Sequence, residues 1–112
     1  MPDLRKDPRY GAFAKAHIAG VLDGENSLKD ISITGCCVES AEKADIQPGV
    51  QYQLEIEPEG AAKIGNFCLV VEQKWMRPIE ESIEIGFVII ASPKGQQFND
   101  YIDYLEYRNS NP

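Results

Sequence analysis

The chain has 112 residues, and its 11 Lys and Arg against 18 Asp and Glu give a net charge of −7 at pH 7. This length fits one domain with a core large enough to fold without disulfides or metal ions. The acidic balance argues against a binder of duplex DNA or RNA, which needs a basic face to displace counterions from many phosphates. Residues 1–9 are an exception, because they hold three basic and two acidic side chains.

No segment has the ~20 apolar residues of a membrane-spanning helix, and the N-terminus lacks the apolar core of a signal peptide. We therefore expect a cytoplasmic protein, either a monomer or a weak homodimer. The three cysteines include no C-x-x-C motif and are expected to be buried or half-buried thiols without a chemical role. No metal-ligand cluster and no catalytic motif is present in the sequence, so we expect neither a metal, nor a cofactor, nor an enzyme.

Alternation of apolar and polar residues predicts six β-strands. Turns are predicted at 23–26, where the sequence reads DGEN, and at 46–49, where Pro48 and Gly49 suit a type II turn. Closely spaced strands with short turns favour an antiparallel barrel, because closure removes the exposed edges of a sheet. The expected strands cover residues 12–22, 26–31, 36–40, 50–57, 63–76 and 83–91.

The pattern changes to helical spacing after residue 91. Phe98, Ile102 and Leu105 recur on one face, which predicts a helix over 93–108 whose apolar stripe covers the barrel. Three tyrosines spaced three apart in this helix are expected at the margin of the stripe rather than as a platform for stacked bases. The predicted fold is all-β, a six-stranded antiparallel β-barrel with a C-terminal α-helix. The whole chain, 1–112, would be one domain, with a flexible segment at 1–11 and the barrel at 12–91.

Two short motifs carry the chemical signal. Arg5 and Arg9 have an R-x-x-x-R spacing, and Asp30, Ser32 and Gly35 form D-x-S-x-x-G about twenty residues later. Together they resemble the PilZ domain family, bacterial receptors for the second messenger cyclic di-GMP, and the resemblance covers nearly the whole chain. It implies a PilZ-type barrel, a cyclic di-GMP site at these five residues, and control of motility, exopolysaccharide, biofilm formation or virulence.

The motif residues suit a ligand with two phosphates and two guanines. The planar fork of arginine pairs bidentately with a phosphate or with guanine O6 and N7, and its face stacks on bases. The Asp30 carboxylate can accept hydrogen bonds from guanine, and the Ser32 hydroxyl can donate to guanine N7 or O6 or accept from its amine. Gly35 is expected to adopt a backbone conformation closed to residues that carry a side chain. The arginine segment would then close across the bound ligand.

Further candidate contacts are Leu4, Lys6 and Arg77. Because Leu4 is apolar where a third arginine could stand, it favours one cyclic di-GMP per chain over a stacked pair. Trp75 ends a long predicted strand and is expected to anchor the core or the rim of the barrel.

Other interpretations of the motifs stay open. The two arginines could be solvated tail charges, and Asp30 with Ser32 could be a plain turn, although a turn residue can also face a ligand. A small barrel that binds single-stranded oligonucleotides is disfavoured by the net charge. The sequence therefore predicts a cyclic di-GMP receptor that acts on a downstream protein partner. The alternative is a PilZ-like adaptor that binds proteins without a nucleotide.

Overall fold

The computed structural model describes residues 8–41, 45–92 and 95–110. Within these ranges, seven strands are followed by one long helix, and a single 3₁₀ turn interrupts the strands. In chain order the elements are β1 (Tyr10–Gly11), β2 (Lys15–His17), β3 (Asn26–Ile31), β4 (Gly35–Ser40), β5 (Gln51–Glu57), η1 (Gly60–Ala62), β6 (Phe67–Ile79), β7 (Ser82–Ala91) and α1 (Gly95–Ser110).

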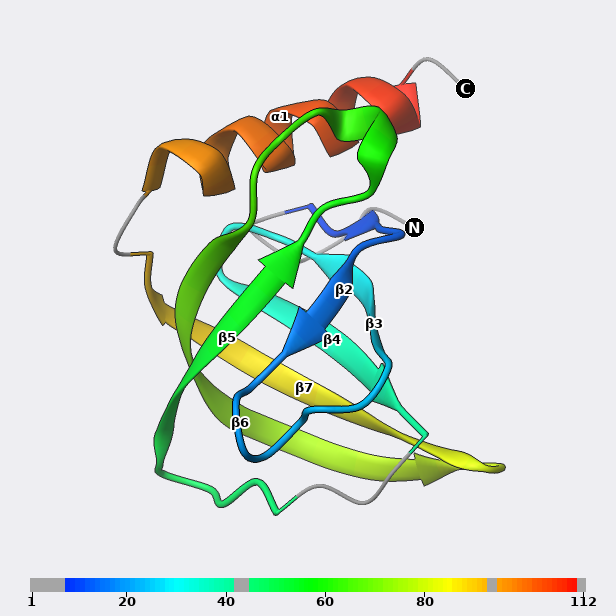
Figure 1. Cartoon of the computed structure of the whole chain (residues 1–112), viewed down its shortest axis with the longest axis vertical. Helices are drawn as coiled ribbons and strands as arrows, with labels where there is room; N and C mark the ends of the chain where they lie inside the picture. The colour runs from blue at the N-terminus through cyan, green and yellow to red at the C-terminus, as the bar shows by residue number, and fades with distance from the viewer. Residues whose placement is uncertain (1–7, 42–44, 93–94, 111–112) are drawn as a thin grey trace.

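Six of the strands form a closed antiparallel barrel (Figure 1). The hydrogen-bonded order is β1-β3-β2-β5-β6-β7-β4, and an additional pairing of β3 with β4 closes the circle. β1 lies outside the circle as a short extra strand paired with β3. The expected six-stranded barrel with a C-terminal helix is therefore confirmed, with β1 as an addition.

The first strand expected from the sequence, at 12–22, is divided in the structure. Only Lys15–His17 belongs to β2, and the chain reverses at residues 19–21, where Gly20 has a φ of 77°. The turn expected at 23–26 is therefore wrong in position. Glycine suits the observed reversal because a positive φ costs it little.

The buried side chain of Asn26 explains why the reversal comes early. Its amide nitrogen donates hydrogen bonds to the carbonyl oxygens of Ala16, Leu22 and Gly24 at 2.9–3.1 Å. These contacts connect the loop at residues 22–24 to the end of β2.

The later boundaries differ from the expected ones by a few residues. β6 begins at Phe67 rather than at 63, because Lys63 ends η1 in a left-handed conformation, with a φ of 55°. The type II turn is confirmed: Gly49 has a φ of 81°, and Val50 N donates to Gln47 O at 3.4 Å. The helix ends at residue 110, and residues 93 and 94 of its expected start lie outside the described residues.

Helix α1 lies across one end of the barrel and covers the core (Figure 1). Phe98, Ile102 and Leu105 are buried beneath it, as the apolar stripe predicted. Tyr101 is fully buried as well, so its expected place at the margin of the stripe is wrong. The Tyr101 hydroxyl donates to Glu59 at 2.5 Å, and Arg108 donates to the same carboxylate at 2.6 Å. Burial, followed by the bond to Glu59, raises the pKa of Tyr101, so its hydroxyl stays protonated. In the described part of the chain, no helix has the length and apolar character needed to cross a bilayer.

The cysteines divide between the interior and the surface. Cys36 and Cys37 are buried, and burial raises their thiol pKa values to about 12 and about 11. Cys68 is exposed on β6, so the expectation that it would be buried or half-buried is wrong. Its side chain points outward because the neighbouring Phe67 and Leu69 occupy the core face of the strand.

Leu105→Ala should lower the free energy of unfolding by about 2–5 kcal/mol, because the side chain is fully buried between α1 and the barrel. Urea denaturation followed by circular dichroism measures this change. Glu106→Ala, on the exposed face of the same helix, is the control and should change stability by less than about 0.5 kcal/mol. Equal effects of the two substitutions would mean that α1 is not packed on the barrel.

Candidate functional site

A β-bulge in β3 places two consecutive side chains on the outside of the barrel. Leu28 pairs with Val38 and Asp30 with Cys37, so the register shifts by one and Lys29 becomes the extra residue. Leu28 points into the core, while Lys29 and Asp30 both lie on the outer face. Bulges commonly re-aim side chains beside functional sites. Here the bulge puts a cation and a carboxylate next to each other.

A second bulge, in β6, turns Trp75 outward. Phe67, Leu69 and Val71 alternate into the core, and continued alternation would place Trp75 there as well. The register with β7 shifts between residues 73 and 75, so Trp75 pairs with Gly86 on the outer face. A Cβ on Gly86 would overlap the indole, so the glycine lets the ring lie across β7. Trp75 was expected in the core or at the rim of the barrel, and the core is wrong, because its side chain lies on the outer face and is 37% exposed.

The two bulges bring these side chains into one row across four strands. The row of paired residues runs from Asp30 on β3 through Cys37 on β4 and Gly86 on β7 to Trp75 on β6. A hollow of about 310 Å³ lies along this row. Its lining residues are Arg9, Lys29, Asp30, Cys37, Trp75, Arg77 and Glu84.

Arg9 joins the two sequence motifs in space. Its Nη1 donates to Asp30 Oδ1 at 2.8 Å, across 21 positions of the chain. β1 fixes this approach, because Tyr10 pairs with Ile31 and Gly11 with Asp30. Both charged side chains are partly exposed, 29% and 36%, so other N–H donors and acceptor sites of the pair face solvent. The last two residues of the segment expected at 1–11 thus belong to the sheet.

Gly35 is required for a reason other than the expected one. Its φ is not in the left-handed region, so the expected special backbone conformation is wrong. A Cβ at this position would instead lie 2.8 Å from the carbonyl oxygen of Phe87 and 3.2 Å from Arg9 Nη2. The glycine therefore lets Arg9 lie against the start of β4.

Ser32 organises the turn between β3 and β4. Its hydroxyl oxygen accepts from Gly35 N at 3.1 Å and from Thr34 N at 3.2 Å, and only 2% of the residue is exposed. These bonds are those of a Ser turn. The structure therefore gives Ser32 a structural task, and its contact with a ligand stays a prediction.

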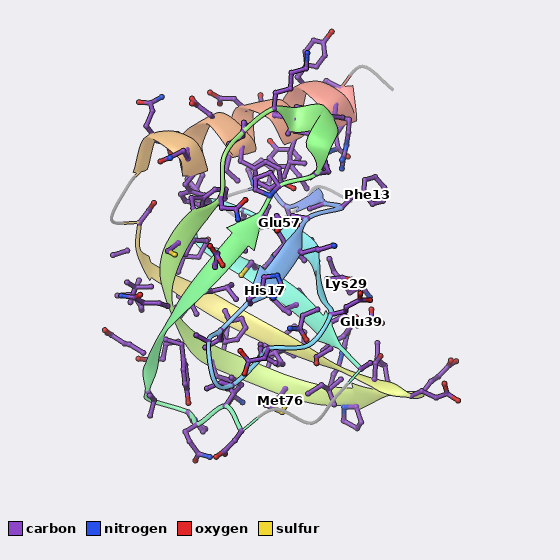
Figure 2. The ribbon with its side chains drawn as sticks, in the orientation of Figure 1. Phe13, His17, Lys29, Glu39, Glu57 and Met76 are labelled. Atoms are coloured by element: carbon purple, nitrogen blue, oxygen red, sulfur yellow. The ribbon has the colours of Figure 1, made fainter. Side chains whose placement is uncertain are left out.

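Glu84 is a buried carboxylate at the far end of the hollow. It accepts a hydrogen bond from Lys29, and Arg77 Nε donates to Glu84 Oε1 at 2.9 Å. Arg77 Nη2 lies 2.8 Å from the same oxygen in an ion pair. The bond from Lys29, then that from Arg77, lowers the pKa of Glu84, and the Glu84 carboxylate in turn raises the pKa of Lys29. Lys29 also lies 3.8 Å from Glu39 on β4, beside it in Figure 2.

The wall of the hollow is cationic on an acidic protein. It holds Arg9, Lys29 and Arg77 against the carboxylates of Asp30 and Glu84, which leaves one net positive charge where the whole chain carries −7. The thiol of Cys37, with its raised pKa, adds no charge. Such a wall, with an indole beside it, can hold a planar ring next to an anionic group. In the described residues, no group of three or more His, Cys, Asp or Glu is arranged to hold a metal ion.

The structure describes some of the predicted site residues and not others. It brings Arg9, Asp30 and Gly35 into contact, and Arg77 lines the same hollow. Arg5, Leu4 and Lys6 lie outside the described residues.

Sequence reasoning missed four of the lining residues: Lys29, Cys37, Trp75 and Glu84. A lysine and a glutamate on strand faces resemble ordinary solvated charges, and a bulge leaves no period-two signal in the sequence. The pair Gly86-Phe87 was a usable signal, because a glycine inside a strand often marks the close approach of another group.

No family model and no curated protein sequence matches the chain. Several solved structures are similar in fold, including the following two. The Bacillus subtilis inhibitor of motility, MotI/DgrA, aligns with 98% of this chain, with a TM-score of 0.78 and 18% identity. The PilZ domain of YcgR from Escherichia coli, with cyclic di-GMP, aligns with 96% of this chain and 95% of its own length, with a TM-score of 0.67 and 20% identity. The chain has a PilZ-like fold. This PilZ-like chain spans about half of the length of MotI, 53%.

Gly35→Ala should destabilise the protein by about 1–3 kcal/mol, because the new methyl group meets backbone at Phe87 and displaces Arg9. Thermal and urea unfolding measure the loss. Gly65→Ala is the matched control, since a Cβ there has open space and the φ of Gly65 is ordinary, so its stability should be unchanged or slightly higher. A Gly35→Ala protein as stable as Gly65→Ala would contradict the close packing described for Gly35.

Proposed function

We propose that this protein is a cyclic di-GMP receptor, and that it takes up the dinucleotide at the hollow beside Arg9 and Asp30. The observation that carries the proposal is the 2.8 Å contact between these two side chains. It joins the second arginine of R-x-x-x-R to the aspartate of D-x-S-x-x-G on a cationic wall. The PilZ-like fold, shared with a domain of YcgR solved with cyclic di-GMP, supports the same ligand.

The dinucleotide offers phosphates and guanines that match the groups of the wall. Arg9 uses one N–H of its fork on Asp30, and its other donors are suited to a phosphate or to guanine O6 and N7. The Asp30 carboxylate, 36% exposed, can accept from guanine N1–H and from the amine. The half-exposed indole of Trp75 provides a surface on which a guanine can stack.

The remaining predicted contacts extend this arrangement. Arg5 would add a second arginine from the N-terminal segment, with Lys6 as a weaker cation and Leu4 as an apolar contact. Ser32 and Gly35 would act by shaping the turn against which the ligand lies. We propose one cyclic di-GMP per chain, because Leu4 offers no additional cationic fork.

Binding would pass a signal to another protein through the surface of the complex. The arginine segment is joined to the barrel through β1, so closure of Arg5 and Arg9 on a ligand would change the face around β3 and β4. We infer a cytoplasmic, non-catalytic regulator, monomeric or weakly dimeric, that acts in motility or biofilm control. The structural similarity to an inhibitor of motility supports the first of these processes.

The alternative function is an adaptor that binds a protein partner and no nucleotide. In that case the Arg9 and Asp30 pair would only fasten β1 to β3. An exposed pair of this kind contributes under about 1 kcal/mol, and fastening a two-residue strand does not need a cationic hollow with an indole in its wall.

Isothermal titration calorimetry on the full chain separates these functions. The ligands are cyclic di-GMP, cyclic di-AMP, GTP and a short single-stranded oligonucleotide. We expect binding of cyclic di-GMP and much weaker binding of cyclic di-AMP, because adenine leaves the Asp30 acceptor without its N1–H partner. Absence of binding to all four would favour the adaptor, and binding of the oligonucleotide alone would overturn the receptor.

Arg9→Ala should weaken cyclic di-GMP binding by about 2 kcal/mol, roughly thirty-fold, because a charge-assisted contact is lost. The melting temperature of the ligand-free variant should stay close to that of the wild type, since the Arg9 and Asp30 pair is partly exposed. Lys15→Ala removes a cation from the exposed face of β2 and serves as the control, with unchanged affinity expected. Equal affinity of Arg9→Ala and Lys15→Ala would reject the role of Arg9.

A further inference from the structure

Two adjacent pairs of residues form a compact block on the outer face of β6 and β7. Trp75 pairs with Gly86, and Arg77 pairs with Glu84. Residues two apart on a strand share a face, so the four side-chain positions form a square. Arg77 Cζ lies 5.0 Å from the centroid of the Trp75 ring, which is within the range of a cation–π contact.

Glu84 is the fixed member of this block. Its side chain is only 4% exposed, whereas those of Arg77 and Lys29 are 65% and 43% exposed. A buried carboxylate is tolerated only when it is paired and hydrogen-bonded, and Glu84 accepts from both cations. The side chains of Lys29 and Arg77 are largely solvated, so the buried Glu84 carboxylate determines their positions.

Arg77 keeps part of its hydrogen-bonding capacity while it is held. A guanidinium has five N–H donors, and Glu84 Oε1 accepts one from Nε and lies 2.8 Å from Nη2 in an ion pair. No other acceptor among the described residues bonds to Arg77, so the Nη1 and Nη2 edge remains available at the rim of the hollow. This edge has the geometry of the bidentate arginine–phosphate pair.

We propose that Glu84 is a positioning residue that holds Arg77 against Trp75, so that the outer edge of Arg77 meets a phosphate of the dinucleotide. This inference rests on the proposed function and adds a cationic contact at the β6 end of the hollow, opposite the Arg9 end on β3. Because Arg77 is restrained before the ligand arrives, less conformational entropy is lost on binding. Arg77 would thus contact a phosphate of the ligand directly, and Glu84 would affect the ligand only through Arg77.

The carboxylate does not cancel the attraction for an anion. Lys29 and Arg77 share the single charge of Glu84, and Glu39 lies beside Lys29 rather than beside Arg77, so the charge of Arg77 is only partly neutralised. Glu84→Gln should therefore fold, because Arg77 is largely solvated and Lys29 keeps the Glu39 carboxylate at 3.8 Å. The substitution also removes a negative charge from the wall, which by itself would strengthen the binding of an anion. Binding is therefore measured at high salt, which screens this charge effect and leaves the effect of the position of Arg77.

The first part of the test uses the ligand-free protein and its single tryptophan. Emission spectra are recorded for the wild type, Glu84→Gln, Arg77→Gln and the control Glu39→Gln, which removes a charge beside Lys29 without touching Arg77. We expect Glu84→Gln and Arg77→Gln to shift the emission alike and Glu39→Gln to leave it unchanged. A shift in Arg77→Gln with none in Glu84→Gln would overturn the positioning role.

The acid titration of the same emission gives a second readout. The pKa of Glu84 is lowered, so the wild-type spectrum should hold as pH falls past 4.5, the ordinary value for glutamate, and change only below it. Glu84→Gln should show no such transition. The same transition in Glu84→Gln would mean that another carboxylate controls the surroundings of Trp75.

The second part is a double-mutant cycle for cyclic di-GMP binding in about 0.5 M salt. Arg77→Gln and Glu84→Gln should each weaken binding roughly ten-fold, and the double variant should be no weaker than either. Glu39→Gln should bind like the wild type. Additive losses, or an unchanged affinity in Arg77→Gln, would overturn the inference. If the wild type does not bind cyclic di-GMP, the proposed function fails together with the ligand contact, while the emission spectra still decide whether Glu84 holds Arg77.

Discussion

The pairing of β3 with β4 is the contact on which the rest of the structure depends. It closes the barrel, so that the core is sealed and no long sheet edge is left at this point. The same pairing contains the bulge at Lys29, which turns Asp30 outward to meet Arg9. Without the bulge, alternation from the buried Leu28 would turn Asp30 into the core and Ile31 outward. The closure of the fold and the placement of the candidate site therefore share one irregularity.

Carboxylates organise the cations of this site. Asp30 holds Arg9 at one end of the hollow, and Glu84 holds Arg77 and Lys29 at the other. An arginine that is restrained on one side presents its remaining donors in a defined direction, whereas a free surface arginine samples many rotamers. This arrangement explains how a chain with a net charge of −7 can still offer a small cationic wall. It also suits a compact ligand with few phosphates better than a long nucleic acid.

The sequence predicted those parts of the fold that follow a regular period. Strands with clean alternation, such as Gln51–Glu57, were placed within a residue of their observed bounds, and the helical stripe at Phe98 and Leu105 was assigned to the core. It failed where a local contact overrides the period. The amide of Asn26 moves the first reversal, and the bulge before Trp75 turns an expected anchor to the surface. Neither effect can be predicted from the alternation of apolar and polar residues.

The candidate site was predicted by its motifs and completed by its geometry. The motifs named Arg9 and Asp30, which the fold brings into contact, but they gave a wrong reason for Gly35. Close approach between a glycine and a distant carbonyl depends on strand register, which one sequence does not reveal. Lys29 and Glu84 were not predicted, because a charged residue on a strand face is usually solvated. Only the packed structure shows that the Glu84 side chain is buried.

Nuclear magnetic resonance of the ¹⁵N-labelled full chain tests the location of the ligand most directly. Trp75 gives the only indole N–H signal of the protein, and it can be followed together with the backbone amides. On addition of cyclic di-GMP, the account predicts shifts at Trp75, at Lys29 and Asp30, and in Gly35–Ser40, with little change in Gln51–Glu57. Shifts confined to the separate hollow beside His17 and Cys68, or no shift at a saturating concentration of the ligand, would contradict it.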